Sequence, residues 1–144
     1  MTAFIRRFMV AALLSTALPG AASAQVPDCD KDLDGCIRWA AAEVATYADE
    51  CGKTFPDRRA DFDAALANWR VLKLPIRGIN DAIKPGSLQR IVLGRKVVPY
   101  LKSIGAYERE IECFGRLAML KSKQPKLYAD SVILPRDALA RYME

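Results

Sequence analysis

The stretch CIRWAAAEVATYADEC, from Cys36 to Cys51, decides the fold of this chain. Its small and apolar residues recur at spacings of three and four, the period of one face of an α-helix. The residues on that face are Cys36, Ala40, Val44, Tyr47 and Cys51. We therefore expect a helix from about Gly35 to Cys51 with this face turned inward, and we expect Gly52 to end it.

The same helix limits how the four cysteines of the chain can pair. Cys36 and Cys51 are fifteen residues apart, so a continuous helix separates them by about 22 Å. A disulfide needs Cα atoms within about 7 Å, which disfavours that pair. Two pairings remain: Cys29–Cys36 with Cys51–Cys113, or Cys29–Cys51 with Cys36–Cys113. The first is favoured, because Cys29 precedes the helix and can fold back over its first turn.

The start of the chain indicates that these cysteines work in an oxidising compartment. Arg6 and Arg7 precede an uncharged apolar run from Phe8 to Leu18, and Ala22–Ala24 offers two small residues around Ser23. This pattern is typical of a secretory signal peptide that is cut before Gln25. In an exported protein, an even number of cysteines predicts a disulfide framework.

The sequence therefore predicts a signal peptide over residues 1–24 and a single helical domain over residues 25–144, located in the periplasm or secreted. The apolar run is too short for a membrane span, which needs about 20 residues, and no later segment qualifies. The two arginines leave twin-arginine export open. The general route is favoured, because nothing in the chain requires folding around a cofactor before export.

Helical periodicity continues along the rest of the chain, and strand alternation is almost missing. We expect a helix over 56–72, with Phe62, Leu66 and Trp69 inward, and a short one around Ile76, Ile79 and Ile83. A further helix should follow a cap at Ser87, with Leu88, Ile91 and Val92 inward. The last two are expected over 94–123 and from Pro135, the latter with Leu139 and Tyr142. The fold class is all-α: a compact bundle of five or six helices, stapled by disulfides.

The stretch 94–123 has the longest periodic pattern. Apolar residues recur every seven positions, at Val97, Ile104, Ile111 and Ala118, and aromatic residues follow the first three, at Tyr100, Tyr107 and Phe114. This pattern predicts one long helix with a buried stripe. Pro99 either starts that helix or kinks it.

Composition argues against catalysis. The chain contains no histidine, which excludes Ser-His-Asp and Cys-His catalysis and removes the commonest metal ligand. Glu108, Glu110 and Glu112 are two residues apart, so on a helix they point away from one another. We expect no catalytic residue and no enzyme activity; a carboxylate-based hydrolase is an alternative.

The acidic segment before the first helix has two interpretations. Asp30, Asp32, Asp34 and Gly35 match the first half of an EF-hand calcium loop, in which alternate carboxylates converge on one hard cation. The twelfth position of such a loop should be a glutamate and is Ala41. The favoured interpretation is that Asp34 caps the helix. We expect no cofactor; a bound calcium ion and an acidic docking patch are the alternatives.

Basic residues form the most regular charged pattern, with a spacing of seven at Arg95, Lys102, Arg109, Arg116 and Lys123. On one helix they would make a slowly drifting row, either solvated or docked onto an anionic partner. Arg116 also has the spacing for an ion pair with Glu112. Trp39 lies off the inner face of its helix and is the best single candidate for a contact surface.

Charge and format together favour a binding protein. Without Arg6 and Arg7 the chain has 20 basic and 17 acidic residues, an excess too mild to indicate nucleic acid. Small, exported, disulfide-stapled chains resemble in format the immunity proteins that act against secreted toxins. We expect an inhibitor- or immunity-like protein that binds another envelope protein or an anionic envelope surface. A calcium- or small-ligand-binding envelope module is the first alternative.

Overall fold

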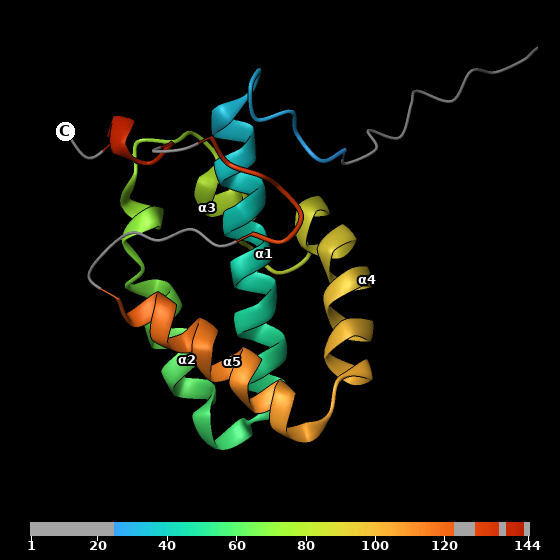
Figure 1. Ribbon diagram of the computed structural model, residues 1–144. Helices are drawn as coiled ribbons and strands as arrows, with labels where there is room; N and C mark the ends of the chain where they lie inside the picture. The colour runs from blue at the N-terminus through green and yellow to red at the C-terminus, as the bar shows by residue number, and fades with distance from the viewer. Residues whose placement is uncertain (1–24, 123–128, 136–137, 143–144) are drawn as a thin grey trace, which may run out of the picture.

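The computed structural model describes residues 25–122, 129–135 and 138–142 (Figure 1). The α-helices are α1 (Leu33–Thr54), α2 (Arg59–Ala67), α3 (Ile79–Ala82), α4 (Leu88–Ser103) and α5 (Ala106–Lys121); the 3-10 turns are η1 (Pro56–Arg58), η2 (Arg70–Lys73) and η3 (Ala140–Tyr142). No described residue is in a strand, and the prediction of an all-α fold is confirmed. The expected signal peptide and Lys123 lie outside the described residues.

Helix α1 runs through the middle of the molecule and contacts α2, α3, α4 and α5 (Figure 1). From Gly35 to Ala48 every residue except Arg38 is buried. One core cluster packs against Val44 and Tyr47, and a second packs against Trp39 and Ala40. The sequence predicted one buried face on this helix. Burial on several sides arises because its many alanines let neighbouring elements approach closely.

The two ends of α1 differ from the expected ones. At the start, Asp32 and not Asp34 is the cap: its Oδ1 accepts the Gly35 N–H at 2.7 Å. At the other end, α1 continues through Gly52 to Thr54. A Cβ atom at Gly52 would lie 2.6 Å from Cδ of Arg59. Glycine is therefore needed there for the close approach of a side chain, not to end the helix.

Two disulfides fasten α1 to other parts of the chain. Cys29–Cys36, with Cα atoms 5.4 Å apart, ties the preceding segment to the first turn of α1. Cys51–Cys113, with Cα atoms 5.5 Å apart, ties the last turns of α1 to the middle of α5. This is the pairing that the sequence favoured, and it leaves no free cysteine. Two disulfides are consistent with an oxidising compartment.

The helix expected over 56–72 is interrupted. The side-chain amide of Asn68 donates to the Ala64 carbonyl at 2.9 Å, and such a bond competes with continuation of the helix. Trp69 then adopts an extended backbone between α2 and η2. Its ring and that of Phe62 are fully buried, as expected, while Leu66 is half-buried. Farther along, Ile79 begins α3, which has only four residues.

The long helix expected over 94–123 is wrong, because the chain breaks at Ile104 and Gly105. Both residues have extended backbones. The Ile104 carbonyl, which a continuous helix would use, accepts instead from Nη2 of Arg109 at 2.9 Å. Past the break the expected buried stripe is lost, and Ile111 and Ala118 are exposed. The buried residues are Leu93, Val97 and Leu101 in α4, and Cys113, Leu117 and Leu120 in α5.

Helix α4 starts as expected, but of the three residues expected to point inward only Val92 packs against the core. Ser87 caps it, with Oγ accepting the Arg90 N–H at 3.3 Å. Leu88 and Ile91, expected to point inward, are 48% and 47% exposed. Pro99 lies inside the helix rather than at its start. None of the helices in the described ranges is long and apolar enough to cross a membrane.

After α5 the chain returns to α1. Residues 129–135, here called the C-terminal strap, cross the N-terminal half of α1 (Figure 1). Val132 is buried there in the same cluster as Trp39 and Leu93. The helix expected after Pro135 is the single turn η3, and Leu139 before it packs against the core. The strap therefore covers a side of α1 that would otherwise face solvent.

Candidate binding surfaces

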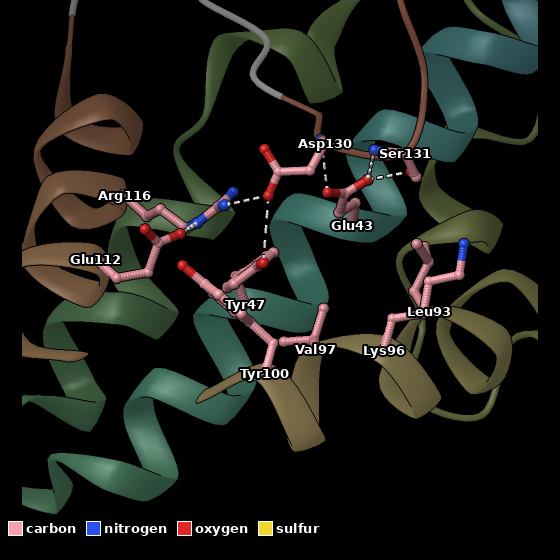
Figure 2. Close-up of a pocket in the computed structure, with 10 residues that line it drawn as sticks. All are labelled: Glu43, Tyr47, Leu93, Lys96, Val97, Tyr100, Glu112, Arg116, Asp130 and Ser131. Carbon is pink, nitrogen blue, oxygen red and sulfur yellow. Dashed lines mark hydrogen bonds and ion pairs between the residues drawn. The ribbon is translucent and has the colours of Figure 1, made fainter. Parts of the chain in front are cut away.

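A cleft of about 490 Å³ lies between α1, α4, α5 and the C-terminal strap (Figure 2). Helix α1 supplies its deepest polar residues, Glu43 and Tyr47. The Ile104–Gly105 break creates the cleft, because it lets α4 and α5 approach α1 from different directions (Figure 1). A sequence interpretation with one long helix could not place this cleft.

Glu43 fixes the strap over the cleft. Its side chain is 2% exposed and accepts the backbone N–H groups of Asp130 and Ser131, at 2.8 and 3.2 Å. It also accepts the Ser131 hydroxyl, which in turn accepts from Nε1 of Trp39 at 2.8 Å. A buried carboxylate is costly unless donors surround it. These donors supply that compensation, so the role of Glu43 is structural.

Arg116 connects three elements on another wall of the cleft. Its guanidinium carbon lies 3.4 Å from the centre of the Tyr47 ring. Its Nε lies 2.6 Å from Glu112 and its Nη2 lies 2.8 Å from Asp130. The ion pair with Glu112 has the spacing that the sequence indicated. Charge-assisted bonds and a stacked ring hold this side chain in one orientation.

Tyr47 donates its hydroxyl to Oδ2 of Asp130 at 3.3 Å. Burial raises the pKa of Tyr47 above its ordinary value; the charges of Asp130 and Glu112 raise it further, against the opposing effect of Arg116. The hydroxyl therefore stays protonated at physiological pH. It acts as a hydrogen-bond donor and not as a base.

The α4 wall of the cleft is less constrained. Lys96 and Tyr100 are exposed residues at its edge. Within the described part of the chain, the Lys96 ammonium makes no ion pair and the Tyr100 hydroxyl makes no hydrogen bond. Leu93 and Val97 lie beneath them and are buried. This wall therefore offers an apolar floor and two polar groups open to a ligand.

The basic row expected from the sequence is not one surface. Arg95 and Lys102 are exposed on α4. Arg109 binds the carbonyl at the helix break, and Arg116 points into the cleft. Lys123 lies outside the described residues. The prediction of a single row is wrong, because a seven-residue spacing places residues on one side only within one continuous helix.

Trp39 was expected to be exposed as a contact residue, and this prediction is wrong. Its side chain is 2% exposed, packed beside Leu93 and Val132. The strap that covers it comes from about 90 residues farther along the chain, and such long-range cover leaves no local signal.

Helix α4 has one exposed face that combines apolar and basic residues. We call it the α4 outer face: Leu88, Ile91, Arg95 and Lys102, which follow one another at helical spacing. The whole helix has four basic residues and no acidic one. Its exposed side is therefore positively charged around an apolar patch.

The acidic residues before α1 take part in local contacts and in capping the helix. Asp32 is occupied in capping α1 and also lies 3.7 Å from Arg38. The Asp30 N–H bonds to the Asp28 side chain, and Asp34 belongs to the first turn of α1. Across the described ranges, no group of three or more His, Cys, Asp or Glu side chains could hold a metal ion.

Comparisons with protein-family models, with curated proteins and with solved structures find no match to this chain.

Proposed function

We propose that this chain is an exported, non-catalytic protein that binds an acidic surface of another envelope protein through the α4 outer face. The observation that carries the proposal is the pair of half-exposed side chains Leu88 and Ile91, in line with Arg95 and Lys102 on a helix without acidic residues. An inhibitor- or immunity-like role fits this arrangement.

The energetics of such a surface suit protein recognition. Burying the exposed halves of Leu88 and Ile91 would stabilise a complex by about 1 kcal/mol each. Charges beside an apolar patch speed the encounter with an oppositely charged partner and disfavour others. The absence of histidine from the sequence supports binding rather than acid–base or nucleophilic catalysis.

The framework behind the surface is stiff, which reduces the entropic cost of binding. Arg90, on the opposite side of α4, donates to Asp49 of α1 and to the Ile83 carbonyl. Leu93, Val97 and Leu101 anchor the same helix in the core. A partner would therefore meet a preformed face.

The test begins with capture of a partner from an envelope extract, followed by affinity measurement with the purified partner. We expect a stoichiometric complex that Ile91→Glu and Arg95→Glu each weaken by about tenfold or more. Ile111→Glu is the matched control, because Ile111 is 56% exposed on α5, away from this face.

Equal weakening by Ile111→Glu would contradict the proposal, since the α4 outer face would then have no special role. Binding to anionic phospholipid vesicles with no protein partner would also contradict it, and would identify a lipid surface as the target. Both measurements use the oxidised protein.

A further inference from the structure

The cleft between α1, α4 and α5 has walls of opposite charge. On the α5 and strap side, Glu112 and Asp130 share one cation, Arg116. Arg116 contacts one oxygen of each carboxylate, Oε1 of Glu112 and Oδ2 of Asp130. The second oxygens have no hydrogen bond within the described residues. This wall therefore carries net negative charge, and the second oxygen of each carboxylate can accept a hydrogen bond from a ligand.

The α4 side carries the opposite charge. Lys96 reaches the edge of the cleft without an ion pair among the described residues. Figure 2 shows it across the cleft from Glu112 and Arg116, with Val97 and Tyr100 between the two sides. Val97 and Leu93 make an apolar floor, so the space between the charges is suited to a hydrocarbon group.

We infer that this cleft binds a zwitterionic amino acid or short peptide with an apolar side chain. The ammonium group lies beside Glu112 and Asp130, the carboxylate beside Lys96, and the side chain over Leu93 and Val97. A simple anion would face the acidic wall and a simple cation would face Lys96. A zwitterion satisfies both walls.

The dimensions and surroundings agree with this ligand class. The volume of about 490 Å³ lies in the range of small-molecule sites, roughly 300–1,000 Å³. Charges that flank a low-dielectric floor interact more strongly than charges in open solvent. None of the α4 outer face residues lines the cleft, so this inference does not depend on the proposed function.

The experiment is calorimetric titration of the oxidised protein with leucine and with leucyl-leucine. N-acetyl-leucine, which lacks the ammonium, and leucine amide, which lacks the carboxylate, test the two ends separately. We expect binding of a free zwitterion and a loss of about tenfold or more for each blocked form. Stronger binding of leucine identifies a free amino acid as the ligand, and stronger binding of leucyl-leucine identifies a peptide.

Variants assign the carboxylate end of the ligand. Lys96→Met should weaken zwitterion binding and remove the preference for leucine over leucine amide. Lys102→Met is the matched control, since Lys102 is exposed on the α4 outer face and should leave binding unchanged. The preference is a ratio measured within one variant, so it reports recognition even if the variant is somewhat less stable.

Three results would overturn the inference: no heat from any zwitterion at millimolar concentration, equal affinity for free and blocked forms, or equal effects of Lys96→Met and Lys102→Met. Capture of a protein partner through Ile91 and Arg95 would be unaffected by any of them, so failure here is distinguishable from failure of the proposed function.

Discussion

At the scale of single residues, the C-terminal strap depends on Glu43. This buried carboxylate accepts three hydrogen bonds from Asp130 and Ser131. We expect Glu43→Gln to lower the free energy of unfolding by about 2–3 kcal/mol, because an amide replaces one acceptor oxygen with a donor and removes the charge that strengthens the bonds. Urea unfolding measures this loss.

The same substitution has a local readout. Amide hydrogen exchange at Asp130 and Ser131 should become faster, while exchange in the middle of α1 should follow only the global change. Glu110→Gln, on an exposed part of α5, serves as the control and should change neither quantity. Unchanged exchange at residues 130 and 131 in Glu43→Gln would contradict the role of Glu43.

Asp49 makes stability depend on pH. Burial alone would raise the pKa of Asp49, but Lys53, Arg90 and Arg59 more than offset it and hold the pKa below its ordinary value of 3.8. The distances to these three cations are each 3.0 Å. Because the folded-state pKa is lowered, the stabilisation is complete above the ordinary pKa and disappears as pH falls through the lowered value.

We therefore expect Asp49→Asn to cost about 1–2 kcal/mol of unfolding free energy at pH 7, where the native carboxylate is charged. The difference between the native protein and the variant should shrink as the pH is lowered toward about 2. Urea unfolding at both pH values tests this, and a difference that does not vary with pH would argue against the ion cluster.

The sequence predicted contacts between residues that are close in the chain, but not contacts between residues that are far apart in it. The spacing of Glu112 and Arg116 indicated their ion pair, because four residues are about one helical turn. Nothing in the sequence indicated that Arg116 also stacks on Tyr47 and binds Asp130. Those contacts depend on where α1 and the strap pass, which spacing within α5 does not contain.

At the scale of elements, the cap of α1 gives a test. Asp32→Ala should lower the free energy of unfolding by about 1 kcal/mol, because the Gly35 N–H loses its side-chain acceptor. Asp30→Ala is the comparison, because Asp30 is exposed and lies before the cap. Denaturant titration of both variants distinguishes the two positions, and equal losses would contradict the assignment of Asp32 as the cap.

The break between α4 and α5 shows the limit of periodicity. Val97, Ile104 and Ile111 keep a seven-residue spacing across it, so the pattern alone predicts continuity. Gly105 was the available warning, since glycine weakens a helix interior by about 1 kcal/mol. That cost is small enough that tertiary packing decides the outcome, and the Arg109 contact with Ile104 is part of that packing.

At the scale of the whole molecule, the two disulfides should contribute unequally. Replacing Cys51 and Cys113 by alanine opens a loop of 62 residues and should cost about 4 kcal/mol, whereas replacing Cys29 and Cys36 opens one of 7 residues and should cost about 2 kcal/mol. Urea unfolding of the two double variants measures both losses. Equal losses would show that loop entropy is not the main contribution.

Disulfide pairing was the most successful inference from the sequence, because a rigid helix turns residue spacing into distance. Cys36 and Cys51 could not meet across one α-helix, and that excluded a pairing before any tertiary contact was known. Burial around α1 was underestimated for the opposite reason. Residues such as Trp39 are covered by Val132 and Ser131. Contacts with residues so far along the chain leave no periodic pattern in the sequence.

The disulfide order also has a consequence for how the chain is made. Each bond joins a cysteine to the next one along the sequence, Cys29 to Cys36 and Cys51 to Cys113. A chain that meets an oxidant from its N-terminus onward closes the first pair before Cys51 emerges. Until Cys113 arrives, no second free thiol is present for the oxidant to join to Cys51. Oxidation in order of emergence thus favours the native connectivity, because each cysteine meets its native partner first.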